Sequence, residues 1–424
     1  MHRSILTLVA AALLLSVSAC SSKSSAFADE NMSKLARIDV RSHGAKGDGA
    51  ADDTAALQKA LDAAAESHSV AVVPAGTFRC GSLNLKSNTT LQLEAGATLQ
   101  GITGDVSLYP VMESSWFAPG SKVYSAVLQA VDAHDVKIVG EGTIDGSGEW
   151  WWKNYLKSEV GRPCLIQFLR CKNVTIEGVH LINSPGWNIH PVFSSDIMIH
   201  SVNIKAPAES KNTDGIDPNS CQNVSIIGCT INVGDDCIAI KSGADVPVDK
   251  RQPTENVVIK DCLMLRGHGG VTIGSETCGS VRNVRVSNCK FEGTDNGIRM
   301  KSRRGRGGVD EEIVCDGIEM KDVKSPIHMT LFYFAKGESK DFKPVDEGTP
   351  TMRNITLRNI RAIGAERVAF IEGLPERPIT DLKFENVHIS ANSGPDITQL
   401  TNFQCTNVVF DVASAGPATK PAKR

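Results

Sequence analysis

The sequence predicts an all-β solenoid, a β-helix that one helix closes at its N-terminal end. The first observation is a recurring unit, an Asn or Asp followed by two branched or long apolar residues with one residue between them. It appears as NVTI at 173, DIMI at 196, NVSI at 223, NVVI at 256, NVRV at 283, NITL at 354 and DLKF at 381. The second observation is that most units lie about two to three dozen residues apart and alternate with period two, with Gly or Asn between them. Short repeated strands rich in Val, Ile and Asn favour a β-helix over helical repeats.

The first twenty residues are typical of an export signal. MHRSILTLVAAALLLSVSAC has a basic start, an apolar run too short to span a membrane, and small residues before Cys20. The stretch VSAC resembles a bacterial lipobox, which predicts a signal peptide over 1–19 and a lipid on Cys20; the alternative is ordinary cleavage near Ala19. Ser21 and Ser22 carry no acidic retention signal. We therefore expect an exported protein anchored to a bacterial membrane, the outer one in a Gram-negative host, with no other membrane contact.

The rest of the chain divides into three predicted parts. Residues 20–36 read as a flexible tether, and 414–424 as a disordered tail. Residues 37–413 form the β-helix domain, which we expect to be monomeric. The net charge of −3 favours neither a nucleic acid nor a bulk polyanion, so any charge selectivity has to be local. Apart from Cys20, the chain has eleven cysteines, and the sequence allows them to be either buried free thiols or disulfide-bonded.

The predicted cap is the segment DDTAALQKALDAAAES, which begins at Asp52. Asp and Thr stand at its start, and Leu57, Ala60, Leu61 and Ala64 share one face. An open solenoid end exposes apolar core and unpaired strand edges, so this helix is expected to cover that end. It is the one convincing helix in the sequence.

Two adjacent carboxylates precede a core strand in GDDCIAIKSG. If Ile238 and Ile240 point inward, strict alternation would also bury Asp236, and an unpaired buried carboxylate is costly. Asp235 and Asp236 are therefore predicted to lie in the bend before the strand, with Lys241 facing outward.

Three other units repeat this arrangement at separations of about one coil. NTDGID places Asp214 and outward Asp217 around an inward Ile, and GHGGVTIGSE places His268 between glycines. NGIRMKS directs Arg299 and Lys301 outward. These residues should stack into one surface patch of acids, one imidazole and cations. Each alone has an ordinary explanation as a turn or solvated residue, and calcium is an alternative for the four Asp residues. Such a patch stabilises a fold poorly but suits the hydrolysis of an acidic sugar.

The blocks NTDGIDP, GDDCIAIKSG, GHGGVTIGSE and IRMKS, in this order, resemble the signature blocks of the polygalacturonases of glycoside hydrolase family 28. The resemblance extends from DVRSHGAKGDGAADDTAALQKAL through GEGTIDGSGEWWW and NSPGWNIHP to GLPERPI. It implies a right-handed parallel β-helix of the pectin-lyase-like type and an inverting, metal-free and cofactor-free hydrolase of polygalacturonate. It also implies these roles: Asp235 as general acid, Asp214 and Asp236 on the water, His268 tuning the acid, and Arg299 and Lys301 on the substrate carboxylate. Lys241 and Asp217 are further candidates for substrate binding.

Four aspects of this hypothesis have alternatives. Acids on neighbouring coils would lie about 5 Å apart, a spacing that suggests retention, whereas the resemblance implies inversion. We favour inversion, because a water held by two acids leaves no obvious covalent nucleophile. Tyr333 would line the product side of the cleft or pack as a buried aromatic; for Trp150, Trp151 and Trp152 we favour a structural role over sugar stacking. The rival functions are rhamnogalacturonan or xylogalacturonan hydrolase, calcium-dependent pectate lyase, and a non-catalytic binding module. The mode of action is endo or exo, and a lipid tether, which suits the trimming of imported oligomers, inclines the interpretation to exo.

Overall fold

The computed structural model describes residues 35–114, 120–334 and 337–413, and these form a parallel β-helix. The predicted signal peptide, Cys20, nearly all of the tether and the tail 414–424 lie outside the described residues. In the described part of the chain, no helix is both long and apolar enough to cross a bilayer.

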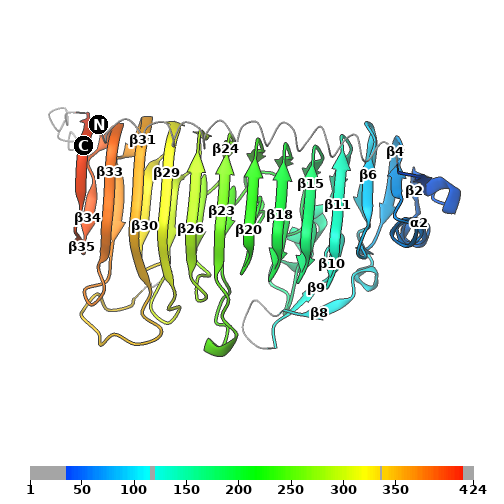
Figure 1. Ribbon diagram of the computed structural model, residues 1–424, viewed down its shortest axis with the longest axis horizontal. Coiled ribbons are helices and arrows are strands. Elements are labelled where there is room, and N and C mark those ends of the chain that lie inside the picture. The colour runs from blue at the N-terminus through cyan, green and yellow to red at the C-terminus, as the bar shows by residue number, and fades with distance from the viewer. Residues whose placement is uncertain (1–34, 115–119, 335–336, 414–424) are drawn as a thin grey trace, which may run out of the picture.

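The largest sheet has 23 strands and covers two faces of the solenoid, and its strands belong to successive coils (Figure 1). On one face lie β1 (Arg37–Asp39), β3 (Val70–Val73), β6 (Thr90–Leu93), β11 (His134–Gly140), β15 (Lys172–Glu177), β18 (Ser195–His200), β20 (Gln222–Ile227), β23 (Thr254–Lys260), β26 (Val281–Ser287), β29 (Val309–Lys321), β31 (Thr351–Arg367), β33 (Ile379–Ser393) and β36 (Gln404–Val412). On the second lie β2 (Asp48–Asp52), β4 (Gly76–Cys80), β7 (Ala97–Gly101), β12 (Thr143–Asp145), β16 (His180–Ile182), β19 (Asn203–Lys205), β21 (Thr230–Asn232), β24 (Leu263–Arg266) and β27 (Lys290–Glu292), while the short β35 (Leu400–Thr401) pairs with β33.

The third face carries the candidate site. Its two sheets contain β5 (Leu83–Asn84), β10 (Leu128–Val131), β14 (Ile166–Leu169) and β17 (Ile189–Val192), and β22 (Ile238–Ile240), β25 (Val271–Gly274), β28 (Asn296–Lys301), β30 (Ser325–Thr330), β32 (Ala369–Glu372) and β34 (Asp396–Thr398). Single bridges from Ile189 to Ile216 and from Ile216 to Ile238 join them. This face is therefore continuous from β5 to β34.

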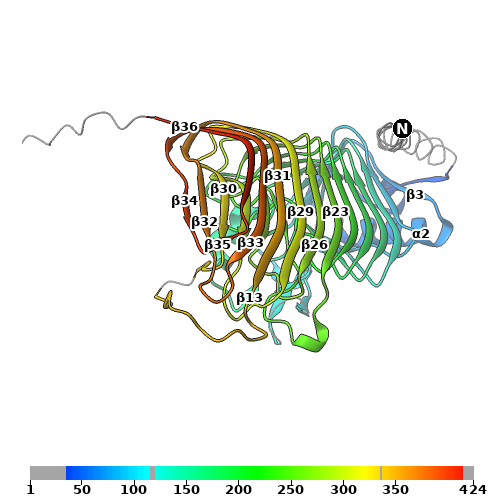
Figure 2. The same ribbon diagram turned by 60° about the vertical axis from the view of Figure 1, so that its left-hand side comes forward.

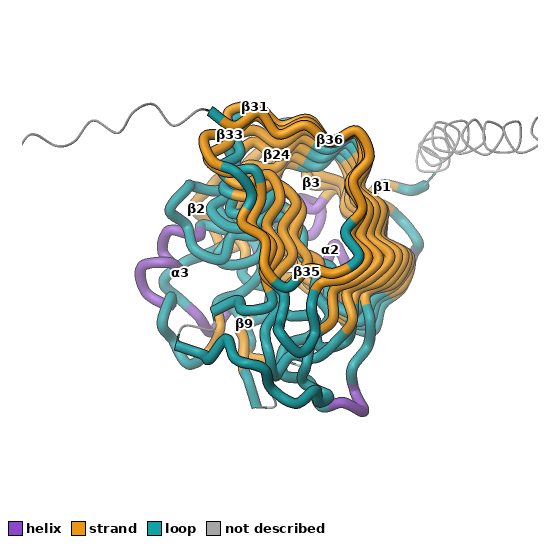
Figure 3. The backbone as a smooth tube through the Cα atoms, turned by 90° about the vertical axis from the view of Figure 1, so that its left-hand side faces the viewer, coloured by secondary structure: helices purple, strands orange, loops and turns teal. Residues whose placement is uncertain are grey.

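The recurring sequence unit explains how the coils stack. The apolar residue after each Asn or Asp is in register with its counterpart on the next coil, as in the series Val174, Ile197, Val224, Val257 and Val284. The Asn or Asp itself adopts a left-handed backbone, for example φ 57° at Asn173 and 59° at Asn256, a conformation that these residues tolerate better than most. The strands predicted from this unit are confirmed, and Figure 3 shows the stacked coils end-on.

The predicted N-terminal cap is α2 (Thr54–Ser67), which buries Leu57, Ala60, Leu61 and Ala64 as expected. It lies at the opposite end of the solenoid from β36 (Figure 2). Its start differs in detail from a simple cap. Asp52 accepts from the backbone and hydroxyl of Thr54, whereas the carboxylate of Asp53 turns away to the N–H groups of Lys46 and Gly47.

The sequence missed a second helix, α3 (Gly148–Tyr155), which contains the three adjacent tryptophans. Trp151 is fully buried and packs edge-on against Tyr109, with Tyr124 and Tyr155 also in contact. So short a helix is marginal by itself, and tertiary packing of this aromatic cluster stabilises it. The cluster also contacts an inserted sheet of β8 (Val111–Glu113), β9 (Lys122–Tyr124) and β13 (Val160–Gly161). Three 3-10 turns complete the structure, η1 (Val40–His43), η2 (Val106–Leu108) and η3 (Val248–Lys250).

The eleven cysteines of the described residues are all free thiols, and most are buried. Cys229, Cys262 and Cys289 take the same place on successive coils, where they fill space as small apolar side chains. Of the two alternatives left open by the sequence, the structure therefore has buried thiols.

Candidate active site

Asp235 and Asp236 lie in the bend between β21 and β22, as the alternation pattern predicts. Gly234 permits this bend, because a Cβ there would collide with the carbonyl oxygen of Ser210. Asp235 accepts from the backbone N–H of Asp236 at 3.0 Å and from that of Asn212 at 3.3 Å. Its carboxylate is therefore held from two neighbouring coils.

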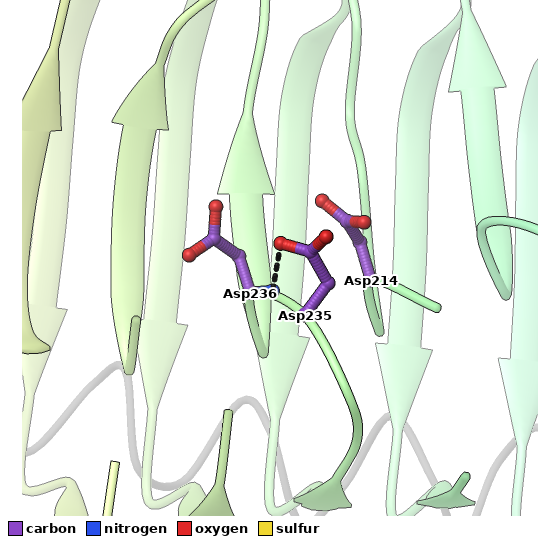
Figure 4. Close-up of side chains that lie close together, drawn as sticks. All are labelled: Asp214, Asp235 and Asp236. Carbon is purple, nitrogen blue, oxygen red and sulfur yellow. Dashed lines mark hydrogen bonds between the residues drawn. The ribbon is translucent and has the colours of Figure 1, made fainter. Parts of the chain in front are cut away.

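Asp214 lies on the preceding coil, beside Asp235 and Asp236 (Figure 4). One carboxylate oxygen from each acid can be chosen so that all three lie within 4.8 Å of one another. The side chain of Asp235 is 20% exposed, that of Asp214 is 5% exposed and that of Asp236 is fully buried. Asp235 is thus the member of this acid cluster that a substrate reaches most readily.

Asp236 is held by both cations of the IRMKS block. Arg299 Nη1 lies 2.9 Å from its Oδ1, and Lys301 Nζ lies 2.7 Å from its Oδ2. Burial alone would raise the pKa of this carboxyl, but Lys301 and Arg299 outweigh that effect and hold the pKa below its usual value. Arg299 and Lys301 face outward from the strand, as the alternation predicts, and both already pair with Asp236 before any substrate is bound.

Lys241 and Asp217 are buried rather than exposed to a substrate. Lys241 faces away from the core, but its ammonium is enclosed by Glu276 at 3.0 Å, Asp217 at 3.5 Å and Asp214 at 3.8 Å, and Trp187 lies 4.8 Å from it. Lys241 is 3% exposed and Asp217 is not exposed at all. Their prediction as direct substrate ligands therefore does not fit the structure, in which Lys241 pairs with Glu276 and packs against two buried acids.

Burial sets the protonation of these acids. It raises the pKa of Asp214 well above its ordinary value, and the charges of Asp217 and Asp235 raise it further. Burial likewise raises the pKa of Asp217 to about 8, although Lys241 opposes it. Near neutral pH the neighbourhood thus combines an ionised Asp236 with carboxyls that retain protons.

His268 and Tyr333 flank the acid cluster. His268 is half-exposed, with Nδ1 3.8 Å from Asp235 and Nε2 3.9 Å from Asp295, so it lies between two carboxylates. The Tyr333 ring lies 4.9 Å from Lys301 Nζ and 5.5 Å from the Arg299 guanidinium carbon. The structure therefore brings both predicted residues to the site.

The acid cluster is also the place where a cation would bind, if one did. A divalent ion bound by Asp214, Asp235 and Asp236 would have to compete with Arg299 and Lys301 for the oxygens of Asp236. The arrangement is better suited to moving protons than to holding a metal.

Sequence reasoning missed three residues at this site, Glu276, Asn212 and Arg162. Glu276 ends the GHGGVTIGSE block, two residues after the end of β25, and an acid so close to a strand end on this face was an available signal. Asn212 contributes its backbone N–H, which no side-chain pattern reveals. Arg162 comes from the segment after α3, outside the four blocks, and donates to Asn212 Oδ1 at 2.9 Å.

Comparisons with known proteins agree on one family. The family model of the glycosyl hydrolases family 28 matches residues 64–415. A probable polygalacturonase of Vitis vinifera is 34% identical over 91% of this chain and 82% of its own length, and an endo-polygalacturonase of Pectobacterium parmentieri is 32% identical over 80% and 85%. Among solved structures, an exopolygalacturonase from Thermotoga maritima superposes with a TM-score of 0.75 at 29% identity, over 86% of this chain and 91% of that one. These relatives include both endo- and exo-acting enzymes.

Proposed function

The chain belongs to glycosyl hydrolase family 28, and we propose that its acid cluster cleaves α-1,4-galacturonosyl linkages by a single displacement. The protein is a polygalacturonase, an enzyme that hydrolyses polygalacturonate. The observation that carries the mechanism is the close placement of Asp214, Asp235 and Asp236, in which the pKa of Asp214 is raised and that of Asp236 is lowered. These opposed environments keep a protonated Asp214 and an ionised Asp236 side by side at one pH.

Asp236 is the carboxylate that stays ionised. Its pairs with Lys301 and Arg299 oppose the effect of burial on its pKa, so it can attract a proton from a water molecule. Asp214 lies beside it and orients the same water. Because its pKa is raised, Asp214 fits the role of a protonated group that hydrogen-bonds this water, rather than the role of a second base. This refines the role that the resemblance implies for Asp214.

Asp235 is the general acid. It has the most exposed carboxyl of the three, and two backbone hydrogen bonds hold that carboxyl in place. The glycosidic oxygen receives the proton of Asp235 as the bond to the leaving sugar breaks. Asp214 and His268 lie beside Asp235, with His268 Nδ1 3.8 Å away, so either could return a proton to Asp235 after turnover.

Burial supports inversion despite the short spacing of the acids. Oxygens within 4.8 Å fit the spacing of retaining enzymes, about 5–5.5 Å, better than that of inverting ones, about 6.5–9.5 Å. A retaining mechanism, however, needs a carboxylate that touches the anomeric carbon. Asp236 lies fully buried between two cations, and Asp214 is nearly fully buried. Neither carboxylate is therefore placed to touch the anomeric carbon, but a water can bridge from them to the sugar. Proton NMR of the first product tests this, since a product with retained configuration would refute the assignment.

The N-terminal side of the site supports exo action. A cavity of about 350 Å³ lies there, walled in part by Val123, Tyr124, Tyr155 and Leu156 from the inserted sheet and the end of α3. A chain entering this cavity meets those walls, so we propose that cleavage occurs near a chain end. Release of only short products of one size from polygalacturonate supports exo action, and a ladder of oligomers refutes it.

The substrate class follows from the cations around the acids. De-esterified polygalacturonate should be cleaved faster than its methyl ester, because Arg299 and Lys301 carry two positive charges against the one negative charge of Asp236, and an esterified ring has no charge for the excess to attract. Equal rates on both polymers would contradict this. A product that absorbs as an unsaturated uronide would instead indicate a lyase.

Export and a lipid on Cys20 remain part of the proposal. They rest on the sequence of residues 1–20, which lie outside the described residues.

A further inference from the structure

The cavity beside the acid cluster contains an arginine, Arg162, that forms no ion pair with any carboxylate of the described residues. Among the residues that line it are Arg162, Gln167, Trp187, Asn212 and Glu276. Its volume, about 350 Å³, is at the lower end of the usual range for small-molecule sites, ~300–1,000 Å³. It adjoins the acids directly, because Asn212 donates to Asp235 and Glu276 pairs with Lys241.

The partners of Arg162 are all neutral. Its Nη1 donates to the carbonyl oxygens of Pro185 and Lys211, and its Nη2 donates to Asn212 Oδ1. No ion pair of the described residues includes Arg162. The three hydrogen bonds leave its Nε–H and one Nη2–H to donate elsewhere. Carbonyl groups therefore hold the guanidinium in place without cancelling its charge.

The other charged groups of the site are already committed. Arg299 and Lys301 pair with Asp236 on the far side of the acid cluster. Glu276, the carboxylate on the wall of the cavity, is paired with Lys241 at 3.0 Å. The available charge in the cavity is therefore that of Arg162, and it is positive.

Arg162 is also mechanically linked to the general acid. The side chain of Asn212 accepts from Arg162, and the backbone N–H of Asn212 donates to Asp235. A carboxylate bound by Arg162 would fix its sugar ring relative to Asp235. An arginine suits this task because its planar guanidinium can hold a carboxylate through two parallel hydrogen bonds.

We propose that Arg162 binds the carboxylate of the galacturonate ring that occupies this cavity, and so selects an unesterified ring at one position beside the cleaved bond. The inference rests on the proposed polygalacturonase function. The inference assigns the cavity to a single uronate ring. Arg162 recognises this ring, whereas Arg299 and Lys301 lie beside a different ring.

The test compares trigalacturonate with its three monomethyl esters, each esterified on a different ring. Wild-type enzyme should show kcat/KM about 10- to 100-fold lower on the isomer whose ester enters the cavity. Arg162→Gln should lower kcat/KM by about the same factor on unesterified trigalacturonate, but lower it little on the isomer whose ester enters the cavity. The variant should therefore no longer discriminate between an esterified and an unesterified ring at this one position. Arg162→Lys, which keeps the charge without the fork, should retain part of it.

Controls separate binding from folding and from loss of the whole function. Arg285→Gln removes an exposed arginine that likewise donates to a backbone carbonyl, that of Glu312, and should change none of the four rates. If Arg162→Gln slows all four substrates equally, Arg162 only supports the Asn212 loop and the inference is overturned. The inference is also overturned if Arg162→Gln discriminates against the ester on this ring as strongly as wild type does. If Arg162→Gln does not fold, the same result with Arg162→Lys overturns the inference. If wild type fails to hydrolyse trigalacturonate and polygalacturonate, the proposed function fails rather than this inference alone.

Discussion

Replacing Lys301 with Met removes one of the two cations that hold Asp236 while keeping the length of the side chain. Lys301 Nζ lies 2.7 Å from Asp236 Oδ2, and both side chains are nearly or fully buried. At an effective dielectric constant of about 20, two charges at that distance attract by roughly 6 kcal/mol, and Arg299 at 2.9 Å supplies a similar amount. The Met variant no longer has the free-energy cost of burying the Lys301 ammonium, and this offsets part of the lost attraction. We expect the free energy of unfolding at pH 7 to fall by about 3–5 kcal/mol, as for other broken buried pairs.

The same substitution should change the pH dependence of activity. The ion pairs lower the pKa of Asp236 in the folded protein. Their stabilisation is therefore present above the pKa of an unfolded aspartate, ~3.9, and is lost as the pH falls through the lower folded value. Without Lys301, burial, which raises the pKa, is opposed mainly by Arg299. Asp236 then takes up a proton at higher pH, and the acidic limb of the kcat/KM profile should move to higher pH.

Denaturant titrations at pH 7 and reducing-end assays on polygalacturonate across the pH range measure both effects. The matched control is Lys290→Met, which breaks an exposed pair with Glu319 at 3.1 Å and should cost no more than about 1 kcal/mol. If Lys301→Met is as stable as this control and keeps the wild-type pH profile, then Lys301 does not hold Asp236 ionised, and the proposed base loses its support.

Three further predictions concern the general acid, the packing around Asp236 and the membrane anchor. Asp235→Asn should lower kcat about 10²- to 10⁴-fold with its denaturation midpoint unchanged, and a variant that keeps more than a tenth of the wild-type rate would contradict the acid role. Gly269→Ala would place a Cβ 2.7 Å from Asp236 Oδ1 and against Thr272 Oγ1, so circular dichroism melting and activity should both decline; unchanged values would show that the bend has room to spare. Cys20→Ser should release active enzyme into the aqueous phase of a detergent separation, and the anchor is disproved if wild type already partitions there.

The fold and the positions of the reacting acids could be predicted from the sequence because local rules determine them. The Asn or Asp that begins each unit tolerates a left-handed backbone, and the alternation after it determines which side chains enter the core. Since successive coils stack in register, residues one coil apart in sequence become neighbours in space. Asp214, Asp235 and Asp236 were therefore predictable as a cluster, as was the outward direction of Arg299 and Lys301.

Alternation determines the face of a strand on which a side chain lies, but only the tertiary structure determines its partner there. Lys241 and Asp217 do face away from the core, yet they are buried, because acids on adjacent coils surround the ammonium. Arg162 reaches the site from the segment after α3, whose position depends on the aromatic packing around Trp151 rather than on any repeat. Burial and charge pairing depend on residues far apart in the chain, so the charges available to a substrate became visible only in the folded molecule.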